Sequence, residues 1–160
     1  TEPGAVPMTK ALKAEIDAAD PVKNGPGMKK AGWPDLKPSD QANFRGDPVP
    51  KDLAPGTKIY RIIGEPGKAN GGYWSLEPPP QDEGEWRAGS AVQNNWNGDG
   101  MYVEHEVGKD GLKGWAGPAR AQMSSDGQSA LPGGAEQFFI PPGSLDPKTI
   151  EAPKPTPWNS

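Results

Sequence analysis

Residues 58–63 read KIYRII and residues 101–107 read MYVEHEV. The first stretch is rich in β-branched and aromatic residues and follows a turn at Pro55 and Gly56, which is typical of a strand. The second stretch alternates, and alternation with a period of two predicts a half-buried strand. Its expected inward face carries Met101, Val103, His105 and Val107. These two segments predict the centre of a sheet.

Working outward, two shorter strands and a helix are expected around this centre. The strands are residues 71–76 (GGYWSL) and 136–140 (EQFFI), each bounded by Gly and Pro. The helix begins after Asp82, which has capping-box spacing to Glu85, and is expected to reach about Asn95. This order of elements predicts an α+β fold with a small, mostly antiparallel sheet, one or two helices and long irregular flanks.

The flanks are expected to be less regular than the centre. A helix capped by Thr9 and ended by Asp20 and Pro21 is predicted near the N-terminus, with Met8, Leu12, Ile16 and Ala19 on its apolar side. Residues 20–57 are interpreted as a linker or as an extended arm that wraps the core.

These patterns divide the chain into three parts. We expect an N-terminal helix and arm at 1–52, a core at 53–143 and a Pro-rich tail at 144–160. The flanks, 1–50 and 146–160, are expected to be dispensable for folding of the core.

Composition excludes several classes of protein. The 160 residues include 22 Gly and 21 Pro, but six Trp and three Tyr supply large apolar surfaces for a small core. No Cys is present, so disulfides, thiolate nucleophiles and Cys-ligated metals are excluded, and one His rules out a multi-His site. A pI near 5.0 argues against a general nucleic-acid or anionic-membrane binder. The sequence holds neither an apolar run of membrane-spanning length nor a signal-peptide pattern.

Arg61 is the first residue that could carry chemistry. It shares a strand face with Ile59 and Ile63, and a guanidinium on an apolar face must meet an anion or lose solvation energy. Arg suits bidentate binding of phosphate or carboxylate, which predicts a ligand contact. The alternative is an Arg that reaches water or pairs with a glutamate.

His105 is the single imidazole and is expected on the inward face of its strand. It has the chemistry of a general base or of a donor to a substrate hydroxyl. The alternative is a hydrogen-bonded histidine of the core. Glu104 and Glu106 would point to the other face, so no metal site is expected here.

Residues 131–140 (LPGGAEQFFI) are the most specific stretch. Two Gly allow close approach of a backbone to a ligand, and Glu136 and Gln137 follow on opposite faces of a strand. Only one of the two is therefore expected to face a cleft, and Gln137 shares the face of Phe139. The alternative is a glycine turn that leads into a core strand with a hydrogen-bonded Gln.

The remaining signals are weak or negative. Trp74, Trp86, Trp96 and Trp115 are interpreted as core residues rather than stacking platforms. Residues 117–120 (GPAR) fit a turn better than a ligand loop. The sequence contains no phosphate loop, no dinucleotide glycine fingerprint, no H-E-x-x-H and no G-x-S-x-G.

The order of these features resembles a known family. Six features follow one another along the chain: an inward Arg61, the GGYWS strand, a helix, the Y-x-x-x-E-V pattern of 102–107, a G-P-A segment with Gln122, and GG-x-x-Q ending at Gln137. This order is similar to that of the NAD-cleaving toxin domains related to tuberculosis necrotizing toxin. More broadly it resembles the ADP-ribosyltransferase-like C-terminal toxins of bacterial secretion and contact-dependent inhibition systems. The resemblance covers about residues 58–143.

The resemblance implies an activity and a site. It implies an ADP-ribosyltransferase-like fold that hydrolyses NAD, with NAD as substrate and no metal. Arg61, or in its place Arg87, would bind the phosphates, and His105 and Gln137 would orient ribose and water. Further residues that would lie on the dinucleotide are Tyr73, Trp74 and Ser75.

Other functions stay open. An ADP-ribosyltransferase that modifies a protein or RNA would use Glu136 on the ribose, and a metal-independent nuclease toxin would use His105. A secreted module without catalysis is the remaining possibility.

The resemblance also implies partners and a location. A cognate immunity protein is expected, without stable nucleic-acid binding or membrane insertion. The first residue is Thr1 rather than Met, which predicts a piece of a longer effector. Such a domain would be secreted or delivered as part of that effector and would act in the cytoplasm of a target cell.

Overall fold

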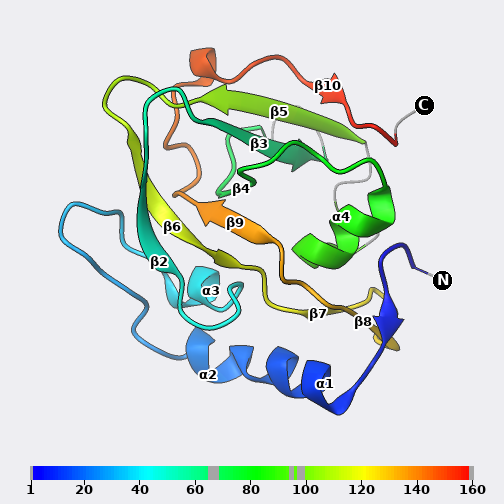
Figure 1. Ribbon diagram of the computed structural model, residues 1–160. Coiled ribbons are helices and arrows are strands. Elements are labelled where there is room, and N and C mark those ends of the chain that lie inside the picture. The colour runs from blue at the N-terminus through cyan, green and yellow to red at the C-terminus, as the bar shows by residue number, and fades with distance from the viewer. Residues whose placement is uncertain (1, 65–68, 94–95, 97–99, 159–160) are drawn as a thin grey trace.

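The two central stretches of the sequence pair directly with each other. The computed structural model describes residues 2–64, 69–93, 96 and 100–158. In it, β3 (Lys58–Ile63) lies antiparallel to β5 (Met101–Glu106), with Arg61 opposite Val103. Strand β10 (Lys154–Pro155) adds to the other side of β5 (Figure 1). The predicted strand pair is therefore the centre of a three-stranded sheet.

A second, four-stranded sheet is built largely from residues that the sequence did not assign to strands. Its order is β2 (Val49–Leu53), β6 (Leu112–Pro118), β9 (Glu136–Phe139) and β4 (Tyr73–Trp74). All three of its neighbouring pairs are antiparallel. Strand β6 includes Gly117 and Pro118, so the expected turn at 117–120 is wrong: these residues pair with Gln137 and Glu136.

One bent ribbon joins the two sheets. Strand β2 continues into β3, and β5 continues into β6, so the same two chain segments pair on both sides of a bend (Figure 1). Leu53 pairs with Leu112 and Lys58 with Glu106, which leaves one more residue on the β5–β6 side of the bend. Such an extra residue bends a strand pair, as in a β-bulge. The bend folds one sheet over the other.

The opposite edge of this sandwich is closed by the residue after β4. Ser75 and Tyr60 exchange backbone hydrogen bonds, with N–O distances of 2.7 and 2.9 Å. The chain from 73 to 75 therefore pairs with β9 of one sheet and then with β3 of the other. A segment that changes sheets in this way forms a corner and brings β3, β4 and β9 together.

The main core lies between the two sheets. It contains the inward residues that alternation predicted on β3 and β5, together with Trp74 and Phe138 from the second sheet. Ile59 is 0% exposed and Val103 is 1% exposed, which confirms the predicted inward faces. Close packing of this kind fixes the relative position of the sheets.

A second cluster covers the outer face of the four-stranded sheet. It is formed by Leu36 and Phe44 packed on Trp115 and Phe139. The segment that carries Leu36 and Phe44 also contains α3 (Pro38–Gln41) and an isolated bridge between Phe44 and Ala119. This part of residues 20–57 therefore wraps the core as an arm, and the linker interpretation does not describe it. The domain boundaries at 52 and 143 stay a prediction.

The helices follow their caps. In α1 (Lys10–Asp17) Thr9 Oγ1 accepts from the amide of Leu12, as expected. Asp20 and Pro21 do not end the helical region, because α2 (Ala19–Lys23) follows at once. In α4 (Glu83–Ser90) Asp82 accepts from the amide of Glu85.

Helix α4 is shorter than expected. Ala91 ends it in the left-handed conformation at φ 54°, and Asn95 lies outside the described residues.

A third sheet completes the fold. It has the order β1 (Val6–Pro7), β8 (Ser129–Leu131) and β7 (Gln122–Met123), and it tethers the N-terminal segment. A 3₁₀ turn, η2 (Pro147–Thr149), precedes β10. The α+β class with small antiparallel sheets and few helices is confirmed. Among the described residues, no helix has the length and apolarity to cross a membrane.

Candidate functional site

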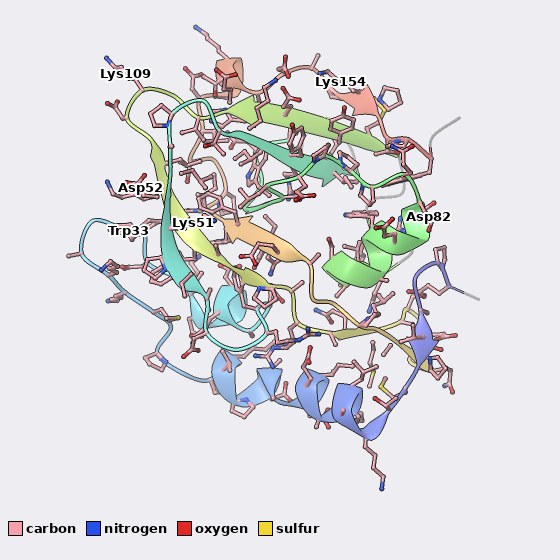
Figure 2. All side chains as sticks on the ribbon, in the orientation of Figure 1. Trp33, Lys51, Asp52, Asp82, Lys109 and Lys154 are labelled. Carbon is pink, nitrogen blue, oxygen red and sulfur yellow. The ribbon has the colours of Figure 1, made fainter. Side chains whose placement is uncertain are left out.

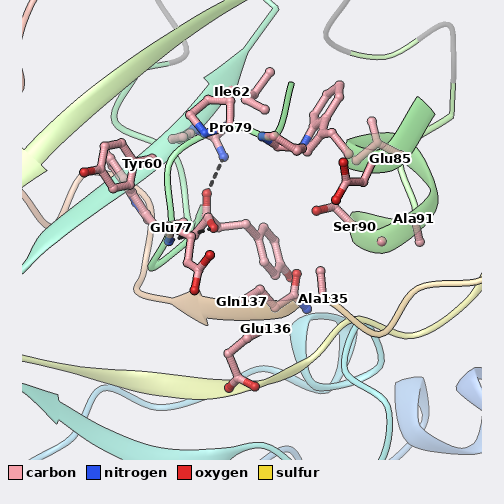
Figure 3. A pocket seen from close by; sticks show the side chains of 18 of the residues that line it. Tyr60, Ile62, Glu77, Pro79, Glu85, Ser90, Ala91, Ala135, Glu136 and Gln137 are labelled. Atoms are coloured by element: carbon pink, nitrogen blue, oxygen red, sulfur yellow. Dashed lines mark hydrogen bonds between the residues drawn. The ribbon is translucent and has the colours of Figure 1, made fainter. Parts of the chain in front are cut away.

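An open cleft of about 1150 Å³ lies where the corner of the sandwich meets α4. Residues of β3, of the chain from 73 to 81, of α4 and of β9 line it. In Figure 3, Glu85 and Ser90 of α4 face it from one side, Tyr60 and Ile62 of β3 lie across from them, and Gln137 lies below. The cleft draws on elements far apart in the sequence, which is common for ligand sites.

Arg61 lies in this cleft on a half-buried wall. Its Nη1 donates to the backbone oxygen of Tyr73 at 3.0 Å. Burial lowers the pKa of the guanidinium from its ordinary value by desolvation, but an Arg keeps its charge at neutral pH. The site therefore holds a fixed positive charge.

Of the predicted strand 71–76 the structure assigns only Tyr73 and Trp74 to β4, and Gly71 before it has a steric role. A Cβ atom at this position would overlap the guanidinium of Arg61, so the side chain lies directly over the Gly71 backbone. The Gly-aromatic strand that carries the family resemblance thus makes room for Arg61.

A hydrogen-bond network fixes the next part of the wall. The Tyr73 hydroxyl donates to Asp40 Oδ1 at 2.7 Å and accepts from Asn43 Nδ2 at 2.7 Å. Burial raises the pKa of Tyr73 far above its ordinary value, and the hydrogen bond to Asp40 raises it further. The phenol therefore stays protonated and acts as a bridge between α3 and the segment that follows it.

Gln137 is attached to the same network. Its Nε2 donates to the Asn43 backbone oxygen at 3.0 Å, and that oxygen also accepts from the Arg120 amide at 3.0 Å. In the part of the chain that the structure describes, the Gln137 amide group makes no other hydrogen bond. Because Nε2 is held, the orientation of the amide is set, and its Oε1 can accept from a ligand hydroxyl.

Glu136 also lines the cleft, so the expectation that only one of the two neighbours faces it is wrong. The two side chains do point to opposite faces of β9, with Phe138 in the core between the sheets and Phe139 in the outer cluster. Both reach the cleft because it surrounds the exposed start of the strand. In Figure 3, Glu136 points away from Gln137.

His105 is not brought to the cleft. It is 6% exposed, its Nδ1 lies 3.1 Å from the backbone oxygen of Thr149, and its ring meets the Trp74 indole edge-on at 6.4 Å. This placement matches the alternative of a hydrogen-bonded core histidine.

Arg87 is also placed outside the cleft lining. Its side chain is 2% exposed and forms a 2.7 Å ion pair with Glu83. Its Nη1 donates to the backbone oxygens of Gln93 and Trp96 at 2.6 and 3.0 Å. Arg87 therefore holds the chain after α4 in place, a role that the sequence pattern did not indicate.

The aromatic residues divide between core and cleft. Trp74 and Trp115 are buried, as expected, although Trp74 also forms part of the cleft floor. Trp86 is half-buried and lines the cleft, and Trp96 is 41% exposed at its rim. For Trp86 and Trp96 the core interpretation is therefore wrong. Ser75 lines the cleft beside Trp74.

Several cleft residues were missed by sequence reasoning. They are Asn43, Glu77, Glu85, Ser90 and Arg120. Glu85 was assigned only a capping function, and Asn43 lies in the arm, which gave no signal. Arg120 is held by the backbone oxygens of Ala42 and Glu15 at 2.7 and 3.0 Å. The cleft therefore combines two guanidinium groups with three carboxylates.

No three His, Cys, Asp or Glu residues come together as a metal site within the described ranges.

Comparisons with known proteins add one result. No family model and no curated protein matches the sequence. A solved structure, that of Tne2 in complex with Tni2, matches with a TM-score of 0.51 and 16% identity. The match covers 71% of this chain and 97% of the other. This chain has the fold of that structure. At this identity the likeness concerns the fold alone.

Proposed function

We propose that this chain is a toxin-like domain that cleaves NAD at the bond between nicotinamide and ribose. One observation carries the proposal: Arg61 and Gln137, which the family resemblance selects, line the same cleft although they lie on different sheets. Tyr73, Trp74 and Ser75 line it between them. The fold shared with Tne2, over nearly the whole of that chain, is consistent with the resemblance.

The charges of the cleft fit such a substrate. A diphosphate requires a positive group in a partly desolvated position, and Arg61 provides one. Burial of Arg61 beside apolar side chains strengthens its attraction for an anion, because the local dielectric is lower than in water. Arg61 would therefore bind the phosphates and set the position of the ribose relative to β9.

The reaction would proceed by loss of the leaving group. The glycosidic C–N bond breaks, nicotinamide leaves with the electron pair, and positive charge develops on the ribose. The Gln137 Oε1 would orient a ribose hydroxyl, and a carboxylate that faces the cleft, such as Glu85, would stabilise the developing cation. Water adds to the ribose and releases a proton to solvent. Nothing in this scheme requires His105.

The test is release of nicotinamide from NAD by the purified chain. Arg61→Ala should abolish turnover at low NAD while thermal unfolding shows a folded protein. Lys58→Ala is a matched control, because Lys58 is on the same strand but its Nζ lies 3.7 Å from Glu104 on the other face. Turnover that survives Arg61→Ala, or no nicotinamide release by the wild type, would rule the proposal out.

ADP-ribosyl transfer is a second candidate, because Glu136 lines the same cleft. A carboxylate there would hold the ribose for attack by an acceptor side chain or nucleotide. Incubation with labelled NAD and a cell lysate separates the two reactions: label on a macromolecule supports transfer. The nuclease alternative depended on His105, and its buried position between Trp74 and Thr149 does not favour it.

The partner and the location are part of this proposal. Tne2 was solved in complex with Tni2, and we expect a cognate immunity protein for this chain as well. Delivery as part of a longer effector into the cytoplasm of a target cell, where NAD is present, agrees with the proposed activity. Co-purification with a candidate immunity protein that blocks nicotinamide release would test the partner.

A further inference from the structure

We infer that Trp158, near the end of the C-terminal tail, is a positioning residue that holds the α4 wall of the cleft. The expected change in KM for NAD rests on the proposed function. The expected loosening of α4 does not. Trp158 stacks on Trp86, with ring centroids 5.6 Å apart and an interplanar angle of 17°. Trp86 in turn lines the cleft. A residue of the expected dispensable tail therefore contacts a wall of the site.

The tail is fastened along β5 before it reaches α4. Ile150 forms a bridge with His105, the Glu151 amide donates to the Glu104 backbone oxygen at 2.9 Å, and Lys154 pairs with Tyr102. Thr156 is 2% exposed, and both its amide and its hydroxyl donate to the backbone oxygen of Gly100. These bonds fix the tail up to two residues before Trp158.

The tail therefore connects two parts of the molecule that the cleft separates. It lies on the outer edge of the β10–β5–β3 sheet, whose strand β3 forms one wall of the cleft. Through Trp158 it reaches α4, which forms the opposite wall. In Figure 1 the tail that follows β10 descends toward α4. The stack thus links the tail on the sheet to the helix that carries Trp86.

Backbone contacts hold the C-terminal turn of α4, and the Gly4 backbone lies against Gly84 and Ala88. The Ala88 and Gly89 backbone oxygens accept from the amides of Gly133 and Ala135 at 2.7 and 3.0 Å. These bonds fix the C-terminal turn of the helix. The Trp86 ring has the Arg87 guanidinium 4.9 Å from its centroid, but Arg87 belongs to the same helix. Trp158 joins the Trp86 side of α4 to the tail, which is paired to β5.

The attraction between two stacked aromatic rings is small compared with the packing of a whole domain. A contact of that size shifts the position of a helix wall without unfolding the domain. We therefore expect Trp158→Ala to raise the KM for NAD roughly five-fold or more and to leave kcat within about two-fold, as for loss of substrate positioning. Trp158→Phe should restore most of the wild-type KM, because a phenyl ring can still stack.

Hydrogen exchange gives a readout that does not depend on activity. In the full chain, Trp158→Ala should speed exchange of the amides of residues 83–92 and leave β6 and β9 unchanged. Trp33→Ala is the matched control: it removes the same side chain from a half-buried site beside β2, away from Lys154 and Asp82 in Figure 2. This control should lower stability, because Trp33 packs against the outer cluster, but it should change neither KM nor exchange in α4.

Each result decides one question. Unchanged exchange in 83–92 in Trp158→Ala overturns the inference, and so does an equal increase throughout the sheets. A change in kcat of more than about two-fold in Trp158→Ala also overturns the inference. So does a raised KM that Trp158→Phe does not restore. If the wild type releases no nicotinamide, the proposed function fails, while the exchange experiment still decides whether Trp158 holds α4.

Discussion

The Nε2 of Gln137 donates to the backbone oxygen of Asn43 at 3.0 Å, so the last strand of the cleft is attached to the arm that precedes β2. This contact orients the amide of Gln137 before any ligand arrives. Preorganised groups of this kind stabilise a transition state without reorganisation during the reaction.

Gln137→Ala should therefore lower kcat for nicotinamide release by ten-fold or more, which corresponds to at least about 1.4 kcal/mol of transition-state stabilisation. Glu136→Ala should change turnover by only a few-fold, because its side chain is exposed and points away from Gln137. Steady-state kinetics of both variants test the ranking. The reverse order, together with label on a macromolecule, would favour ADP-ribosyl transfer.

Gly71→Ala tests Arg61 without changing its charge. The added methyl group would overlap the guanidinium, so the side chain must leave its present position. We expect the KM for NAD to rise by about ten-fold or more, since displacement removes the phosphate contact from its fixed geometry. Gly108→Ala is the control, because a Cβ there meets no atom within 4 Å. Equal KM values for the two variants would argue against a role of Arg61 in binding.

Because Tyr73 is buried as a neutral phenol, we expect the free energy of unfolding to fall at alkaline pH. Burial raises its pKa in the native state, whereas in the unfolded chain it titrates near its ordinary value of about 10. Below that value both states hold the proton and the contribution is complete. Above it the unfolded state loses the proton first, so the free energy of unfolding falls by about 1.4 kcal/mol per pH unit from this residue.

Urea unfolding of wild type and Tyr73→Phe between neutral pH and pH values above about 10 measures this slope. The variant lacks the hydroxyl bonds to Asp40 and Asn43, so it should be less stable at neutral pH. Its stability should fall less steeply as the pH rises. Parallel curves for the two proteins would show that Tyr73 is not the titrating group.

Phe44 tests whether the arm belongs to the core. Its side chain is 0% exposed and packs with Trp115 and Phe139 beneath the cleft. Phe44→Ala should lower the free energy of unfolding by about 3–5 kcal/mol, the usual range for a buried aromatic residue. Val49→Ala is the control, because Val49 is 58% exposed on β2. If a fragment that begins at residue 51 unfolds like the full chain, the arm is dispensable after all.

The sequence predicted well where local pattern and packing agree. The alternation of 101–107 and the β-branched run of 58–63 gave the central pair, and the cap residues Thr9 and Asp82 gave two helix starts. Arg61 was correctly singled out because a guanidinium among inward isoleucines is unusual. A charged side chain on an apolar strand face needs a polar or open surrounding, and the cleft provides one for Arg61.

The sequence failed where a strand depends on its partner. Strand β6 contains Gly114, Gly117 and Pro118 and has no strand pattern of its own, yet it pairs with β2 and β9 over its length. A Cβ at Gly114 would overlap Phe138, so the glycine is there to admit the phenyl ring. Such a reason is visible only once the neighbouring strand is known. The same holds for Asn43, whose place in the site depends on contacts with Tyr73 and Gln137.

The bent ribbon has a consequence for how the protein reaches its native state. Strands β3 and β5 pair across the intervening residues 64–100, and β2 and β6 across a longer separation, so no turn of the ribbon forms by a local hairpin. Closing such long loops costs conformational entropy before the strand contacts form. Pairing of distant segments therefore slows folding. We expect refolding on a timescale of about milliseconds to seconds rather than microseconds, with the whole ribbon forming in one cooperative step. A chain with this topology would gain activity only after that step, because β3 with Arg61 belongs to the ribbon and β9 with Gln137 pairs with its strand β6.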